Sequence, residues 1–137
     1  MRNFKRDKQK YDNLIEAYRR KNDLLIRWIK NIHQGISVCE YLEQENIHTI
    51  AIYGHTPIAE CFADELLRSN IKVKYIIDRN PAFDVYKGIE TVGLDTDFHD
   101  VDLIVITVVE YYDEIEETLS KITNAKVAAI DDLIFSA

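Results

Sequence analysis

The segment TIAIYGHTPIAECFADELL, Thr49 to Leu67, decides the fold of this 137-residue chain. A short apolar run ends at Gly54, and a helix pattern follows in which Thr56 suits the N-cap and Pro57 the first helical position. The next segment, Ile71 to Ile77, is β-branched and aromatic, which is typical of a buried strand. Strand, helix and strand in this order predict a parallel βαβ unit.

The alternation of strand and helix patterns continues toward the C-terminus. DLIVITV, at 102–108, is the strongest strand pattern of the chain; YYDEIEETLSKI predicts a helix, KVAAID a last strand and DLIF a terminal turn. The intervening RNPAFDVYKGIETVGLD reads as a loop with at most a short strand near Glu90 to Val92. We therefore expect an α/β fold with an open, mostly parallel, Rossmann-like sheet of about four or five strands.

A helical extension precedes this unit. From Lys8 to Gln34, apolar residues recur at steps of three and four, which predicts an amphipathic helix. They are Tyr11, Leu14, Ile15, Tyr18, Leu25, Trp28, Ile29 and Ile32. Gly35 then suits a helix stop, and Ser37 caps a short helix from Val38 to about Gln44. The pattern divides the chain into a helical extension, 1–46, and a Rossmann-like domain, 47–137. The repeat of about 3.5 residues favours a helical hairpin or the seam of a homodimer.

Charge and composition limit the class of partner. Residues 1–34 carry ten Lys or Arg and four Asp or Glu, a balance of +6, whereas residues 35–137 carry seven and twenty, a balance of −13. Such an acidic body repels nucleic acid, and docking of the basic segment on the chain's own acidic body or on a second copy is preferred to a nucleic acid or membrane partner. No apolar run is long enough to span a membrane or to serve as a signal, so we expect a cytoplasmic protein in which Cys39 and Cys61 stay reduced.

The loop after the first strand departs from the dinucleotide fingerprint G-x-G-x-x-G. Its three glycine positions are occupied by Gly54, Thr56 and Ala59. Alanine is accepted at the third position, but a β-branched residue at the second lies where a pyrophosphate would approach the backbone. Asp78 ends the second strand, where a ribose-binding acid belongs. The Thr56 hydroxyl would either cap the following helix or bind a phosphate directly, and the sequence leaves both roles open.

The candidate ligand-binding residues cluster at the carboxyl edge of the expected sheet, where open α/β folds bind ligands. Gly54, His55, Thr56 and Asp78 would line one wall of the crevice, and the segment from Thr107 to Glu110 the other. Tyr111 or Tyr112 would stack on a base or sugar, or else pack in the core. The other histidines, which are His33, His48 and His99, are scattered singly and form no metal-binding pattern.

The segments around these residues carry a family resemblance. The residues that carry it are Tyr53, Gly54, Ile77, Asp78, Gly88, Ile89 and Val92. Over about residues 47–137 the chain resembles the small Rossmann-like domains of bacterial surface-polysaccharide biosynthesis proteins. It is similar to the N-terminal domain of sugar acyltransferases of the sialic-acid and bacillosamine type and to nucleotide-sugar dehydratases. The resemblance implies a domain that binds a nucleotide or nucleotide-sugar, with catalysis carried out by a following domain.

No catalytic motif supports an enzyme. None of the tyrosines begins a Tyr-x-x-x-Lys pair, and no G-x-S-x-G, H-E-x-x-H or P-loop sequence occurs. The interpretation is a non-catalytic nucleotide or nucleotide-sugar binding domain, with NAD and nucleotide-sugars both open as ligands. The alternatives are a degenerate Rossmann module that serves interaction or oligomerisation without a ligand, and an NAD-dependent sugar-nucleotide enzyme completed by a partner.

Overall fold

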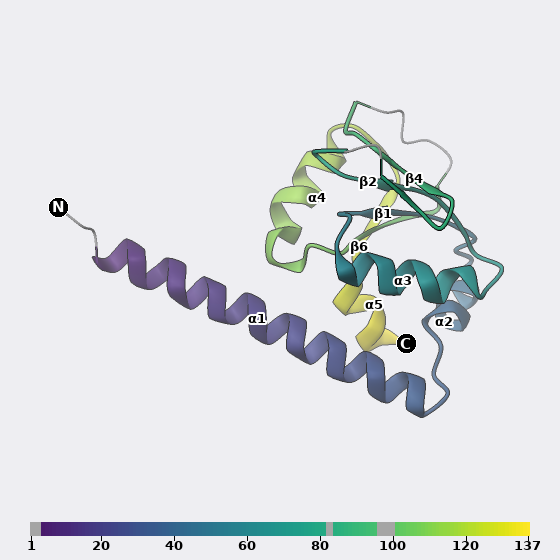
Figure 1. Cartoon of the computed structure of the whole chain (residues 1–137), viewed down its shortest axis with the longest axis horizontal. Coiled ribbons are helices and arrows are strands. Elements are labelled where there is room, and N and C mark those ends of the chain that lie inside the picture. Colours follow the sequence, from purple (N-terminus) through teal and green to yellow (C-terminus); the bar gives the residue numbers. More distant parts are fainter. Residues whose placement is uncertain (1–3, 82–83, 96–100) are drawn as a thin grey trace.

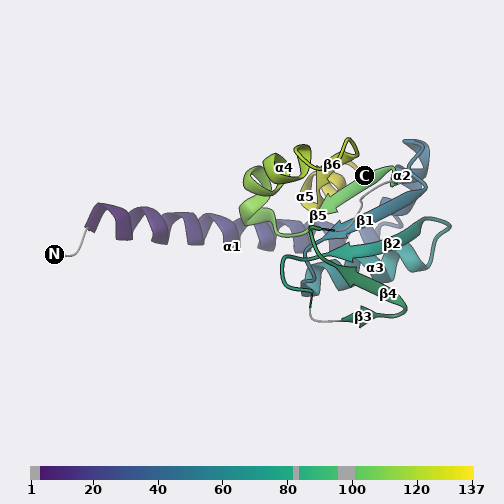
Figure 2. The ribbon, with the colours of Figure 1, turned by 90° about the horizontal axis from the view of Figure 1, so that it is seen from above.

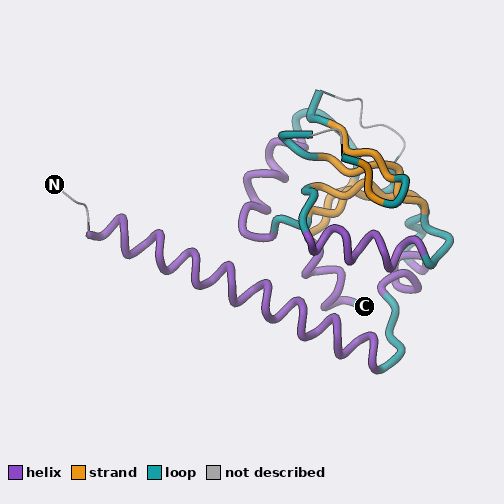
Figure 3. Tube along the Cα trace, viewed as in Figure 1, coloured by secondary structure: helices purple, strands orange, loops and turns teal. Residues whose placement is uncertain are grey.

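The computed structural model describes residues 4–81, 84–95 and 101–137, so His99 lies outside the described residues. Two helices come first, and the strands and helices of the sheet domain follow, with β2 to β5 succeeding one another without a helix among the described residues (Figure 3). In chain order they are α1 (Phe4–His33), α2 (Val38–Gln44), β1 (Thr49–Tyr53), α3 (Pro57–Leu67), β2 (Lys72–Ile77), β3 (Val85–Tyr86), β4 (Ile89–Val92), β5 (Leu103–Ile106), the 3-10 helix η1 (Val109–Tyr111), α4 (Tyr112–Ser120), β6 (Lys126–Ala129) and α5 (Ile130–Ser136). The terminal turn expected from DLIF is a helix, α5.

The strands form one six-stranded sheet in the order β3-β4-β2-β1-β5-β6. Every neighbouring pair is parallel except β3 with β4, which is antiparallel. The predicted α/β class, with a mostly parallel sheet and an N-terminal helix, is confirmed. The sheet is mixed, however, and it has one strand more than the upper expected number.

The additional strand belongs to a tight hairpin that the sequence reading assigned to a loop. β3 and β4 are joined by Lys87 and Gly88, whose φ angles are 48° and 85°. Two positive φ angles in a two-residue connection are those of a type I′ turn, which matches the twist of antiparallel strands. A strand of two residues is too short to produce an alternating pattern, and for this reason β3 is not predictable from periodicity.

Both faces of the sheet are covered by helices. On β1, Ile50 and Ile52 join a cluster with residues of α1, α2, α3 and α5, while Ala51 and Tyr53 point to the opposite face, toward α4. Figure 1 shows α3 and α5 between the strands and α1. The central strands are therefore buried on both faces, as their nearly continuous apolar sequences predict.

Only the C-terminal half of α1 packs against the rest of the molecule. Leu24 and Trp28 are buried, and the Trp28 indole N–H donates a 2.6 Å hydrogen bond to Glu65 of α3. Trp28 also meets Phe62 edge to face, with ring centroids 6.4 Å apart. Trp28 therefore belongs to the core of its own chain, although the sequence repeat assigned it to an exposed seam. The N-terminal half of α1 extends away from the body (Figures 1 and 2).

Two further expectations concern membranes and thiols. Within the described ranges, no helix combines the length and the apolar character that a membrane crossing requires. Both cysteines are free thiols, Cys39 buried under α3 and Cys61 exposed on that helix.

Candidate functional site

The loop after β1 makes a tight turn at the carboxyl edge of the sheet. Gly54 adopts a φ of +93°, a conformation that glycine allows at low cost. Thr56 is the N-cap of α3, and its hydroxyl accepts a 3.1 Å hydrogen bond from the Ala59 N–H. Pro57 follows at the first turn, as the sequence predicts. Of the two roles open to Thr56, the structure therefore shows the helix cap.

Gly54 faces protein rather than an open crevice. A Cβ built on it would lie 2.5 Å from the Val108 Cγ2 and 3.1 Å from the Thr107 Oγ1. Thr107 is buried, and its hydroxyl lies 2.9 Å from the Tyr53 carbonyl and 3.0 Å from the Gly54 carbonyl, with the Thr56 hydroxyl at 3.2 Å. The residues after β5 thus fill the space that a dinucleotide fingerprint keeps for backbone and ligand.

The first turn of α3 offers few groups to an anion. Pro57 has no N–H, the Ala59 N–H is bound by the Thr56 side chain, and the Glu60 N–H is bound by the Thr56 carbonyl. Three of the four positions from Pro57 to Glu60 are therefore closed to a phosphate that relies on free N–H groups. The Glu60 carboxylate at this end of the helix adds repulsion toward an anion.

Asp78 connects the loops that follow β1 and β2. One carboxylate oxygen accepts the His55 N–H at 3.0 Å, and the other accepts the Asn80 N–H at 3.0 Å. Both carboxylate oxygens of Asp78 therefore bind backbone N–H groups of the neighbouring loops. These are the oxygens that would otherwise accept hydrogen bonds from a ribose. The predicted residues Gly54, His55, Thr56, Asp78 and Thr107 do come together, as parts of one hydrogen-bonded turn.

Glu110, the remaining predicted site residue, lies on η1 and faces α1. Its carboxylate forms a 3.0 Å ion pair with Lys21, and the neighbouring Val109 carbonyl accepts a hydrogen bond from Arg20. Among the two candidate stacking residues, Tyr111 is exposed, whereas burial and a hydrogen bond with Glu116 raise the pKa of Tyr112 to about 12. Val109 and Glu110 of η1 are thus bonded to α1.

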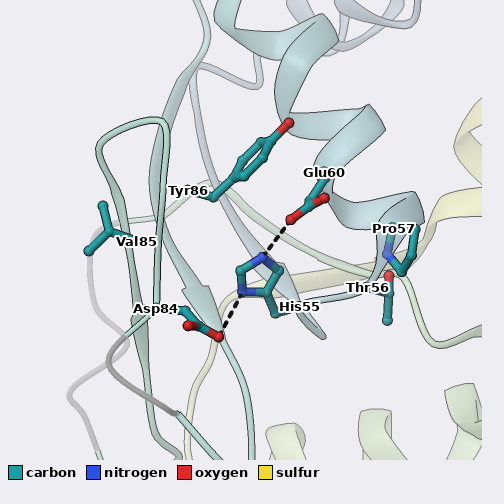
Figure 4. A pocket seen from close by; sticks show the side chains of 7 residues that line it. All are labelled: His55, Thr56, Pro57, Glu60, Asp84, Val85 and Tyr86. Carbon is teal, nitrogen blue, oxygen red and sulfur yellow. Dashed lines mark hydrogen bonds and ion pairs between the residues drawn. The ribbon is translucent and has the colours of Figure 1, made fainter.

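A small open pocket lies on the other side of this turn, beside the β3–β4 hairpin (Figure 4). It has a volume of about 370 Å³. Its lining combines hydrogen-bonding side chains with one aromatic ring and two small apolar groups, and consists of His55, Thr56, Pro57, Glu60, Asp84, Val85 and Tyr86. The sequence reading identified His55 and Thr56 here but missed the other polar members.

His55 is the central polar group of the pocket. Its Nε2 lies 3.1 Å from a Glu60 carboxylate oxygen, and its Nδ1 lies 3.3 Å from the Thr91 hydroxyl and 3.9 Å from an Asp84 oxygen. The ring also meets Tyr86 edge to face, at 6.2 Å between centroids. The imidazole is only 16% exposed and has a hydrogen-bonding partner at each ring nitrogen, which orients the ring in the pocket.

Asp64 of α3 holds the hairpin wall of the pocket in place. One of its oxygens accepts hydrogen bonds from the Tyr86 hydroxyl at 2.8 Å and from the Lys87 ammonium at 2.7 Å. These two hydrogen bonds lower the pKa of the Asp64 carboxyl, and the bond from Lys87 has the larger effect. The same contacts raise the pKa values of Tyr86 and Lys87. The spacing of His55 and Glu60 was visible in the sequence, but Asp84 and Tyr86 reach the pocket only because the hairpin folds back.

The described residues contain no cluster of three His, Cys, Asp or Glu side chains that would hold a metal ion. Comparison of the chain with models of protein families, with curated proteins and with solved structures finds no match. The geometry of the pocket and of the surface is therefore the basis on which a function rests.

Proposed function

We propose that this chain is a non-catalytic binding domain that takes the hydroxylated part of a nucleotide or nucleotide-sugar into the pocket around His55. One observation carries the proposal: side chains that donate and accept hydrogen bonds converge on an open pocket beside the carboxyl end of β1. Ligands of open α/β sheets bind at this edge.

The strand order supports a Rossmann-like ancestry for the domain. Without the hairpin strand β3, the order β4-β2-β1-β5-β6 corresponds to the order 3-2-1-4-5 of the Rossmann sheet. The pocket then lies on the side of β1 that faces β2 and β4, the half of that sheet that takes the first mononucleotide. The resemblance to surface-polysaccharide proteins places such a domain in bacterial sugar-nucleotide metabolism in the cytoplasm, as part of the proposal.

The pocket chemistry narrows the ligand. Glu60 and Asp84 repel phosphate, whereas they accept hydrogen bonds from sugar hydroxyls, and Tyr86 supplies an aromatic ring against which a sugar is able to pack. The turn at Gly54 is packed by Val108 and leaves no approach for a pyrophosphate. The bound group is therefore a glycosyl or ribosyl unit, with any phosphate directed toward solvent.

A thermal-shift panel tests the proposal. The compounds are uridine, UDP, a UDP-sugar, the corresponding free sugar, NAD and inorganic pyrophosphate. We expect stabilisation by the compounds that contain a sugar unit; at a hundred times the dissociation constant, the gain is about 2.7 kcal/mol, or several degrees for a chain of this size. His55→Ala removes the shift, while His48→Ala, which changes an exposed histidine at the opposite end of β1, retains it.

Two outcomes would contradict this assignment. A chain that responds to none of the compounds has no such site. A chain that responds to UDP and pyrophosphate but not to uridine or the free sugar binds the phosphate, and the sugar-binding role of the pocket is then wrong.

A second candidate function, interaction through α1, is favoured by a different observation. The projecting part of that helix carries large apolar side chains that are more than half exposed within the described part of the chain, including Tyr11, Leu14 and Tyr18. We propose that the chain forms a homodimer through α1. Sedimentation velocity over a range of concentrations tests it, since a monomer at every concentration would exclude self-association.

A further inference from the structure

The projecting half of α1 is an apolar surface without intramolecular support. The whole helix has 30 residues and is about 45 Å long at 1.5 Å per residue. Among residues 5–19 none is buried, and Tyr11, Leu14 and Tyr18 are 64%, 52% and 63% exposed. An isolated helical segment of about fifteen residues, the size of the projecting half, is marginal in water unless its apolar face packs against another surface. The projecting half therefore has the properties of an arm that a partner covers.

The body of the same molecule contains a groove of matching character. It lies between the C-terminal half of α1 and α3 and has a volume of about 620 Å³. Its apolar lining comes mainly from Leu25, Trp28, Ile29, Ile32 and Ile36. Three charged residues border it: Asp64 and Glu65 of α3 and Arg68, the C-cap of that helix. An apolar helix face of similar width fits such a groove.

The arm and the groove are related by the spacing of the sequence. Heptad positions are taken by Tyr11, Tyr18, Leu25 and Ile32, seven residues apart. If two copies of α1 run antiparallel about a two-fold axis between Lys21 and Asn22, each arm residue faces a groove residue of the other copy. The pairs are Tyr11 with Ile32, Leu14 with Ile29, and Tyr18 with Leu25.

From this correspondence we infer that α1 pairs antiparallel with α1 of a second copy, each arm filling the groove on the partner's body. The inference rests on the homodimer proposed above and adds its orientation and register. Such an interface is isologous, since the same surface of both copies takes part. Asn22, an exposed polar residue beside the axis, defines the register, because a shift by one heptad would place its amide against an apolar residue of the other copy.

Charge favours the same orientation. The arm begins with Lys5, Arg6, Lys8 and Lys10, against which Asp7 is the single acid as far as Tyr11. A parallel pair would bring the two basic arms together and leave both grooves open. The antiparallel pair instead places each basic arm beside the acidic body of the other copy, with Asp64 and Glu65 at the groove.

Site-directed cross-linking tests the orientation in the full-length chain. Cys61 is exposed and is first replaced by serine, while Cys39 is buried and is kept. Leu14 and Ile29, both exposed, are then changed to cysteine, singly and together, and treated with a short bismaleimide. Within one helix these two positions are about 22 Å apart, so a short reagent joins them only between copies.

The expected result is a covalent dimer from the Leu14→Cys/Ile29→Cys double variant and from a mixture of the two single variants. Neither single variant alone should cross-link efficiently. Cross-linking of Leu14→Cys with itself would indicate a parallel pair, and a dimer in sedimentation that gives no Leu14–Ile29 product would exclude the register; both results overturn the inference and leave the homodimer intact. A monomer in sedimentation overturns the homodimer itself.

Discussion

The two candidate surfaces lie at the carboxyl edge of the sheet and along the helix α1. They differ in how far their side chains are hydrogen-bonded or packed within the same chain. At the edge, Thr56, Asp78 and Thr107 bind neighbouring backbone or side-chain groups, and Val108 packs on Gly54. Along α1, large apolar side chains are left in water. Polar residues that resemble ligand contacts are thus bonded within the chain, whereas most of the apolar repeat along α1 is exposed. A candidate site is best recognised by the groups that the fold leaves without a partner.

The largest expected effect separates two adjacent residues of α1. Trp28 is 5% exposed and Ile29 is 54% exposed. Trp28→Ala removes a buried indole and the donor to Glu65, and should lower the free energy of unfolding by about 3–5 kcal/mol. Ile29→Ala should change the free energy of unfolding of the diluted monomer by less than about 0.5 kcal/mol. The same substitution should weaken self-association.

Urea denaturation at low protein concentration and sedimentation at high concentration measure the two effects. If Ile29→Ala destabilises the monomer as much as Trp28→Ala does, the division of α1 into a core side and a partner side is wrong.

A smaller effect distinguishes the closed turn from an open one. Gly54 and Gly88 have similar φ angles, +93° and +85°, but a Cβ would meet Val108 at 2.5 Å in the first case and nothing within 4 Å in the second. Gly88→Ala should cost about 1–2 kcal/mol from the left-handed conformation alone. Gly54→Ala adds about 1–3 kcal/mol of overpacking to that cost.

The double variant Gly54→Ala/Val108→Ala should recover part of the overpacking cost. Equal losses for the two glycine variants in urea denaturation would show that the turn has room for a side chain, and with it room for a ligand at Gly54.

Sequence reasoning predicted the regular elements well where local chemistry defines them. β1 and α2 have the expected bounds, because Gly54 ends the strand and because Ser37 caps the helix with a hydrogen bond to the Cys39 N–H. Sequence reasoning failed where an element is held in place by a contact with residues far away in the chain. The hairpin wall of the pocket depends on bonds from Tyr86 and Lys87 to Asp64.

The same limit applies to the candidate site. The motif at Gly54 correctly predicts a turn and a helix cap, but its closure by Val108 comes from the segment after β5, more than fifty residues away. The burial of Trp28 similarly depends on α3, so a repeat in sequence could not separate core positions from exposed ones.

The smallest expected effect concerns the amino end of β1. There Asp102 accepts hydrogen bonds from backbone N–H groups, as Asp78 does at the carboxyl end. One Asp102 oxygen accepts the His48 N–H at 2.8 Å and the Thr49 N–H at 3.1 Å. The His48 bond is the main cause that lowers the pKa of Asp102 below its ordinary 3.8. The folded state then binds this proton less readily than the unfolded state, so the contribution of Asp102 to stability is present above that ordinary value and is lost as the pH falls through the folded value.

Asp102→Asn should therefore make the urea midpoint fall less steeply with acidification between about pH 5 and pH 2. Asp12→Asn, on the projecting arm, should leave that pH dependence unchanged. Parallel acid limbs for the wild type and Asp102→Asn would mean that this carboxylate does not stabilise the start of β1 through its charge.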